Sequence, residues 1–249
     1  MNELIKKLEK NCKGQVTVNK NNNHVIINYN NKNIEYYIRN DNKKLGSNCY
    51  VFNFGLATDC PSNKLGLCPL GRDGSCYACK SENQYETTRT SRKNQGLALD
   101  FIENNELYLE FVLGLLKLSK GRYKNYMKFL RLNEACDIRH KKDIIFIKKI
   151  ASLLKLIDIP IIIYTHRKDL DLTNLNSNII VNYSEYYHKN NKNHNYIIVI
   201  KDNNELKQKI KKLKELKLNN YSICCGSCIE CKHRNCFKNN NNIIFFKKH

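Results

Sequence analysis

The sequence predicts an α/β fold whose parallel sheet forms either an open, partial barrel of βα units or an open sheet with covered faces. Continuous apolar runs at residues 161–165, 178–183 and 196–200 are typical of strands that are buried on both faces. An amphipathic stretch at residues 143–156 has the spacing of a helix that covers such a sheet. Right-handed crossovers between units of this kind can produce both architectures.

The first 42 residues are expected to form an embellishment of this core. Residues 1–11 carry apolar side chains at helical spacing, which predicts a short amphipathic helix. Between residues 24 and 38, apolar and polar residues alternate on either side of an asparagine-rich turn, which predicts a β-hairpin.

Residues 43–220 are expected to form the core, and residues 221–249 a C-terminal cysteine cluster and tail. The predicted core elements are a strand at 49–54, helices at 95–101 and 106–117, a strand at 127–132, a helix at 143–156, strands at 161–165, 178–183 and 196–200, and a helix at 204–216. Asp202 and Glu205 can cap the last helix. Because loops at the carboxyl ends of parallel strands carry function, we expect the cysteine loop at residues 60–79 on that edge.

The composition indicates a soluble, cytoplasmic protein that folds without disulfides. A chain of 249 residues with 41% hydrophobic content can bury a sizeable core. Residues 1–13 are polar and rich in lysine, unlike a signal peptide, so we expect a reducing compartment in which the 12 cysteines are able to bind metal. No apolar run has the length of a membrane span, so no membrane association is expected. The oligomeric state stays open.

The formal net charge of +20 favours an anionic partner, such as nucleic acid or a nucleotide-like substrate. A second explanation is compositional, because the chain is rich in Asn, Lys and Ile, as expected of an AT-rich coding sequence. Both explanations stay open at this point.

Two groups of cysteines predict two metal sites. The first group is Cys60, Cys68, Cys76 and Cys79, separated by seven, seven and two residues, and the second is Cys225, Cys228, Cys231 and Cys236, separated by two, two and four residues. Consecutive two-residue gaps are typical of 4Fe-4S clusters, whereas zinc sites more often pair two knuckles across a longer loop. We therefore expect iron-sulfur clusters, with zinc as the alternative. Cys224, taken with Cys228 and Cys231, offers a further spacing of three and two residues, but this segment follows the terminal helix rather than a first strand.

Four segments of the chain, in the same order, are similar to the gene product 88 family of phage proteins. They include DCPSNKLGLCPLGRDGSCYACKSENQYETTRTSRKNQ, KFLRLNEACDIRHKKD and CCGSCIECKHRNC. The resemblance covers roughly residues 44–238. It implies a short barrel like that of radical S-adenosylmethionine enzymes, and a virus or provirus as the source, hence the host cytoplasm. The functional residues that it implies are the ligands Cys60, Cys68 and Cys76, the neighbouring Tyr77, and Arg92, Arg131 and Asp137.

The chain departs from that family at two thiols. Cys136 stands where the family has glycine, and Cys79 is an added cysteine. Three ligands would leave one iron open to S-adenosylmethionine or substrate, whereas four would close it. Two hypotheses follow: a radical-S-adenosylmethionine-like enzyme acting on a nucleotide or nucleic acid, or a nucleic-acid-binding protein with two closed sites. A third, with Asp137 as a nucleophile in base exchange, has least support.

Other polar residues near the predicted strand ends carry weaker signals. Asp137 and Arg139 follow the strand at 127–132, where an active carboxylate and cation or a structural salt bridge could lie. His140, His166 and His233 are each flanked by Arg or Lys, so we expect them to be exposed to solvent.

Overall fold

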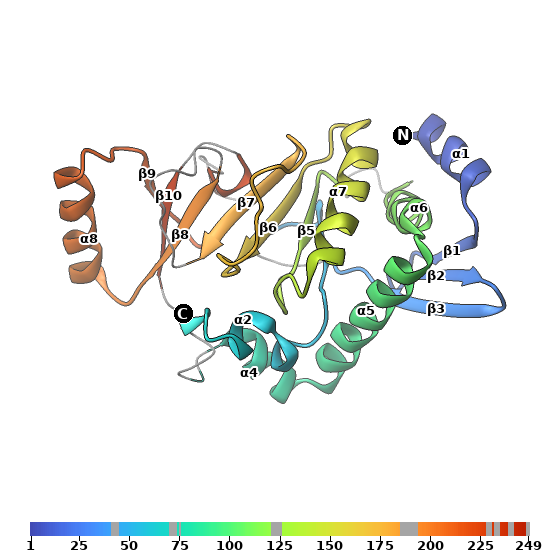
Figure 1. The fold of residues 1–249 in the computed structure, drawn as a ribbon, viewed down its shortest axis with the longest axis horizontal. Helices are drawn as coiled ribbons and strands as arrows, with labels where there is room; N and C mark the ends of the chain where they lie inside the picture. Colours follow the sequence, from blue (N-terminus) through green and yellow to red (C-terminus); the bar gives the residue numbers. More distant parts are fainter. Residues whose placement is uncertain are drawn as a thin grey trace.

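The computed structural model describes residues 1–40, 45–69, 74, 76–120, 126–184, 194–227, 231, 235–238 and 242–247. Within these residues the strands form two sheets (Figure 1). One is a three-stranded antiparallel sheet of order β1-β2-β3, and the other is a seven-stranded sheet of order β4-β5-β6-β7-β8-β10-β9 in which neighbouring strands are parallel. The predicted α/β class with a parallel sheet is confirmed, and the sheet does not close on itself.

The strands of the large sheet are β4 (Cys49–Phe52), β5 (Phe129–Leu132), β6 (Ile161–Thr165), β7 (Ile179–Ser184), β8 (Asn195–Ile200), β9 (Tyr221–Ile223) and β10 (Ile243–Lys247). The small sheet contains β1 (Gln15–Asn19), β2 (His24–Tyr29) and β3 (Lys32–Tyr37). The α-helices are α1 (Asn2–Asn11), α2 (Pro61–Lys64), α4 (Tyr77–Gln84), α5 (Glu86–Asn105), α6 (Tyr108–Ser119), α7 (Lys141–Lys155) and α8 (Asn203–Glu215). Two short 3-10 turns are η1 (Ala57–Asp59) and η2 (Asn235–Phe237).

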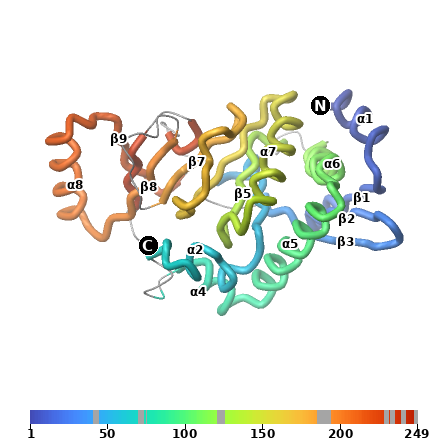
Figure 2. Tube along the Cα trace, in the orientation of Figure 1, coloured from blue at the N-terminus to red at the C-terminus, as the bar shows by residue number. Residues whose placement is uncertain are grey.

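Helices α6 and α7 cover one face of the large sheet through aromatic packing. The ring of Phe52 on β4 lies 5.0 Å from that of Phe111 on α6, and Phe111 lies 5.1 Å from Phe146 on α7. Leu132 and Ile163 extend this core along β5 and β6. The small sheet packs against α5 and α6, as the blue and green parts of the trace in Figure 2 show. The N-terminal segment therefore covers these helices, and it also reaches the edge of the large sheet, where Arg39 pairs with Val51 of β4.

The C-terminal segment packs on the opposite face of the large sheet. Phe237 of η2 stacks edge-on against Phe129, with ring centroids 4.7 Å apart. The side-chain amide of Asn182 on β7 donates to the carbonyl of Cys236 at 3.1 Å. Because side chains alternate between faces, Phe129 shares its face with Arg131. Cys236 therefore lies over the face that carries Arg131.

The core strands lie within a few residues of their predicted bounds, but α5 begins at Glu86, well before the helix predicted at 95–101, and α2 and α4 were not predicted. Strands at both ends of the chain were missed as well. The predicted hairpin is confirmed as β2 and β3, but β1 adds a third strand to it. At the other end, β10 pairs with β8 and β9, so the tail completes the sheet. The cap of α8 is confirmed, since the Asp202 carboxylate accepts from the backbone N–H of Asn204 and Glu205, while the Glu205 carboxylate accepts from Lys201 N.

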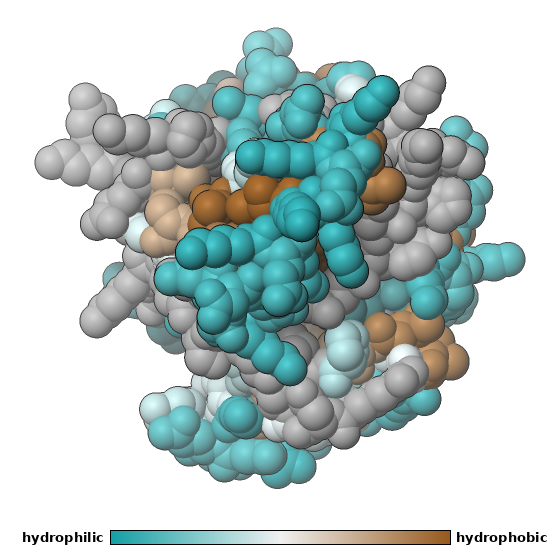
Figure 3. Space-filling model, turned by 90° about the vertical axis from the view of Figure 1, so that its left-hand side faces the viewer, coloured by the Kyte–Doolittle hydropathy of each residue, from teal (hydrophilic) through white to brown (hydrophobic). Residues whose placement is uncertain are grey.

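Helix α8 forms a basic end of the molecule. Its exposed lysines are Lys207, Lys211, Lys212 and Lys214. Figure 3 looks onto this end and shows hydrophilic residues over much of the described surface, beside a band of apolar residues. Among the described residues, no helix has both the length and the apolar character that crossing a bilayer requires.

Candidate functional site

A cavity of about 210 Å³ lies at the carboxyl ends of four neighbouring strands, β4 to β7. Cysteines of the loop that follows β4 line it, and so do residues 133–137 after β5, His166 after β6 and Ser184 at the end of β7. The cysteine loop is therefore on the edge of the sheet where it was predicted. Parallel strands bring their carboxyl ends together, so this edge collects side chains that are distant in sequence.

Four thiols line the cavity. Cys60, Cys68 and Cys76 are the three ligands that the resemblance implied, and the fourth is Cys136, which sequence reasoning had not assigned as a ligand. Cys79 is not one of the described residues that line the cavity. It lies beside Cys76, and burial together with Cys76 raises the pKa of the Cys79 thiol to about 12. The structure thus favours Cys136 over Cys79 as the fourth thiol of this cavity.

Cys60 and Cys136 form a hydrogen-bonded pair. The Cys136 thiol, which also lies 3.6 Å from the carbonyl oxygen of Asp137 as a possible acceptor, interacts with Cys60 and lowers the pKa of Cys60 to about 7, against the opposing effect of burial. The backbone N–H of Asp137 also donates to the Cys60 sulfur at 3.3 Å. The same hydrogen bond, with burial, raises the pKa of Cys136 well above its ordinary value. Cys60 is thus the member of the pair that holds negative charge near neutral pH, as a metal ligand must.

This pair predicts the alkylation behaviour of Cys60. In chelator-treated protein, iodoacetamide is expected to modify Cys60 with a midpoint near pH 7, because the thiolate is the nucleophile. Removing the donor with Cys136→Ala is expected to move the midpoint upward, since only the weaker backbone donors of Asn63 and Asp137 then oppose burial. Peptide mapping by mass spectrometry measures the rate at Cys60, with Cys12, whose pKa is raised to about 12 mainly by burial, as the unreactive internal control. An unchanged midpoint in Cys136→Ala would contradict the pairing.

Cys136 occupies a backbone conformation that favours glycine. Its φ is +61°, and Asn133 in the same loop has a φ of +56°. Asparagine tolerates this left-handed region, but a cysteine there costs on the order of 1 kcal/mol. A thiol that lines the cavity in spite of this strain is consistent with a functional role for Cys136.

The Asp137 carboxylate fastens the cysteine loop to the strand ends. Ser62 Oγ of α2 donates to Oδ2 at 2.7 Å, and Thr165 Oγ1 of β6 donates to Oδ1 at 2.7 Å. The backbone N–H groups of His166 and Ile138 each donate at 2.8 Å. Because protein donors surround both oxygens, the geometry describes a positioning residue.

Arg131 presents a buried donor at the cavity. Its guanidinium carbon lies 4.7 Å from the centre of the Tyr164 ring, a cation–π contact, and both side chains line the cavity. The Nε of Arg131 is buried and has no hydrogen-bond partner among the described residues. An unpaired buried donor on a cation is costly, so an anionic group in the cavity would relieve it.

Arg92 lies outside the cavity lining, in a buried ion pair with Glu82. The Arg92 guanidinium donates to Glu82 Oε1 and to the carbonyl of Ala78, both at 3.0 Å. Glu82 also accepts from the backbone N–H of Ala57 at 2.8 Å. These bonds hold α4, which begins directly after Cys76, against η1. Arg92 therefore positions the cysteine loop.

Two other predicted site residues lie at the cavity. Tyr77 is about half exposed, lines the cavity, and donates its hydroxyl to the carbonyl of Glu134 at 3.0 Å. The expected exposure of His166 was wrong, because its half-buried side chain lines the cavity, held there by the bond from its backbone to Asp137. His140 is exposed as predicted, and His233 lies outside the described residues.

The second cysteine group is described in part. Cys228 lies outside the described residues, Cys225 is exposed and donates to the carbonyl of Ser227 at 3.1 Å, and Cys231 is half-buried. Cys236 is buried with Ile197 and Ile244 in a small apolar cluster against which Tyr164 packs. Tyr164 therefore links this segment to the cavity.

Among the described residues, no three cysteine sulfurs all lie within 4.8 Å of one another. Within the described part of the chain, the group of three potential ligands whose atoms all lie within 4.8 Å of one another is Asp100, Glu103 and His140, which contains no cysteine. A zinc ion holds its thiolates by bonds of about 2.3 Å and so draws them closer together. Thiols around a cubane bind different irons and stand further apart.

Comparison of the chain with models of protein families, with curated proteins and with solved structures found no match.

Proposed function

We propose that the chain is an iron-sulfur protein whose cavity works as a radical-S-adenosylmethionine-like site on a nucleotide or nucleic-acid substrate. The observation that carries this proposal is the meeting of Cys60, Cys68 and Cys76 at one cavity on the carboxyl edge of the parallel sheet. The resemblance to the gene product 88 family of phage proteins points the same way. In this proposal the sheet curves partly around the site, as an incomplete barrel would.

The residues of the cavity fit a cluster of net negative charge. Cys60 favours the thiolate near neutral pH, and the Asp137 N–H donates to its sulfur. Hydrogen bonds to ligand sulfurs stabilise a cluster and tune its potential. The Arg131 guanidinium supplies a cation, and its unpaired Nε is available to an anionic group. Thiols, donors and cation together make a donor set suited to iron and sulfide.

When bound and reduced, a cluster with one open iron supplies an electron to S-adenosylmethionine and so starts radical chemistry. The side chains of the chain would hold the reactants. Arg131 can pair with a carboxylate or phosphate, and Tyr164 already packs against that guanidinium. Lysines of α8 at the basic end can attract an anionic substrate.

Cys136 favours a second candidate function. As a fourth thiol in the cavity lining it can close the remaining iron, and the C-terminal cysteines can form a second closed site. Both sites would then be structural, and the protein would bind nucleic acid through its basic surface without catalysis. Zinc in place of iron at these sites would fit this second function as well.

One experiment separates the two functions. S-adenosylmethionine added to the reduced, anaerobically purified protein is expected to perturb the electron paramagnetic resonance signal of the cluster and to release 5′-deoxyadenosine. The Cys76→Ala variant, which lacks a ligand, is the matched control and should release none.

A spectrum that S-adenosylmethionine leaves unchanged, with no 5′-deoxyadenosine formed, would support the closed site instead. The Cys136→Gly variant then tests the closure, because glycine suits the φ of this position and removes only the thiol. If that variant gains the response to S-adenosylmethionine, Cys136 is the ligand that closes the site.

A further inference from the structure

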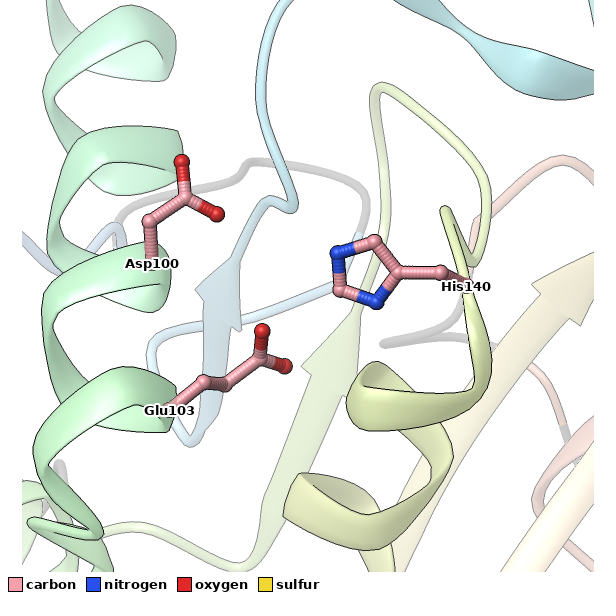
Figure 4. Close-up of side chains that lie close together, drawn as sticks. All are labelled: Asp100, Glu103 and His140. Atoms are coloured by element: carbon pink, nitrogen blue, oxygen red, sulfur yellow. The ribbon is translucent and has the colours of Figure 1, made fainter.

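A second cluster of potential metal ligands lies between α5 and the start of α7, apart from the cysteines. Asp100 and Glu103 come from α5, and His140 directly precedes α7. Their side chains point toward one another, as Figure 4 shows. One ligand atom from each lies within 4.8 Å of the others. Residues three apart on a helix share a face, which is why Asp100 and Glu103 approach the histidine together.

The surroundings of Glu103 indicate that this cluster lacks a cation or a proton. Its side chain is only 3% exposed, and its Oε1 is buried without a hydrogen-bond donor among the described residues. Its other oxygen, Oε2, accepts from Arg139 at 3.4 Å. A buried carboxylate oxygen without a donor costs stability unless a cation or a proton satisfies it.

The charges around the cluster are out of balance. Arg139 donates to Asp100 at 2.7 Å and to Asp143 at 2.9 Å, in addition to Glu103. One guanidinium thus faces three carboxylates.

We propose that Asp100, Glu103 and His140 bind a divalent first-row cation such as Mn²⁺ or Zn²⁺, with Arg139 and Asp143 orienting the ligands from outside. Two carboxylates and one imidazole are donors that these cations accept, and Mn²⁺, unlike Zn²⁺, is not a metal that thiolate sites select. His140 and Asp100 have 47% and 51% exposed side chains, so an ion can reach the site from solvent. The metal would tie α5 to the start of α7, next to the loop that carries Cys136 and Asp137.

Mn²⁺ is the probe that tests this proposal, because thiolates bind it weakly. The loss of the free Mn²⁺ signal in electron paramagnetic resonance measures its binding to the full chain. One tight equivalent is expected. Glu103→Gln and His140→Ala should each weaken the affinity by about tenfold or more, as ligand changes do.

Matched controls are Glu86→Gln, which removes a carboxylate from the same helix, and His24→Ala, which removes a histidine elsewhere; both should bind Mn²⁺ as the wild type does. Nitrogen coupling in the spectrum of bound Mn²⁺ should be present in the wild type and absent from His140→Ala. Folding is verified by circular dichroism, and the half-exposed Asp100→Asn serves if Glu103→Gln unfolds. Equal binding by the wild type and the ligand variants, or no binding up to millimolar Mn²⁺, would overturn the proposal.

Discussion

Cys76→Ala is expected to remove the iron and sulfide of one cluster and to leave those of the second. Cys76 lines the cavity on the segment that begins α4, so its loss deprives that cluster of a ligand without touching the sheet. Iron and acid-labile sulfide assays on anaerobically purified protein measure the effect, and absorption near 400 nm should fall in parallel.

Cys12→Ala is the matched control, because Cys12 lies beside α1, away from the cavity lining, and should keep the full metal content. Cys79→Ala extends the comparison, since Cys79 is also not among the described lining residues. Unchanged iron in Cys76→Ala, or equal loss in Cys12→Ala, would show that the cavity does not hold the cluster.

Asp137→Ala is expected to destabilise the fold by about 3 kcal/mol or more. The reason is that the change leaves the hydroxyls of Ser62 and Thr165 and the backbone N–H groups of Ile138 and His166 without their acceptor in a buried setting. Urea unfolding monitored by circular dichroism measures the loss. Asp171→Ala is the control, because Asp171 is exposed and accepts only from nearby Thr173.

The Asp137→Ala variant also distinguishes a positioning role of this carboxylate from a catalytic one. If Asp137→Ala unfolds at the urea concentration of the wild type but no longer supports the release of 5′-deoxyadenosine, the carboxylate acts on the reactants, and its positioning role is wrong. A large loss of stability together with loss of the cluster is the expected outcome, since Ser62 ties the cysteine loop to Asp137.

The sequence predicted the core because its signals there are local. Ile161–Thr165 is a short, wholly apolar run, and its bounds as β6 agree with the prediction. The edge of the sheet that carries the site followed from the order of strands and the rule for parallel sheets. By contrast, β10 pairs with β8, a partner more than 40 residues away, and nothing in the tail itself identifies that partner.

The residues that complete the cavity were harder to predict for a related physical reason. Cys136 is isolated in sequence from the cysteine loop, and only the packing of β4 beside β5 brings it to Cys60. Its left-handed φ is a property of the folded loop that the sequence around Cys136 does not reveal. His166 was misjudged from its basic neighbours, since flanking charge does not reveal which way a side chain at a strand end points.

The metal content of the full chain, purified without oxygen, shows whether the protein is an iron-sulfur protein. We expect brown protein with iron and acid-labile sulfide for about two clusters per chain, a broad absorption near 400 nm, and loss of one cluster in Cys76→Ala. Colourless protein that holds zinc and no sulfide would contradict it.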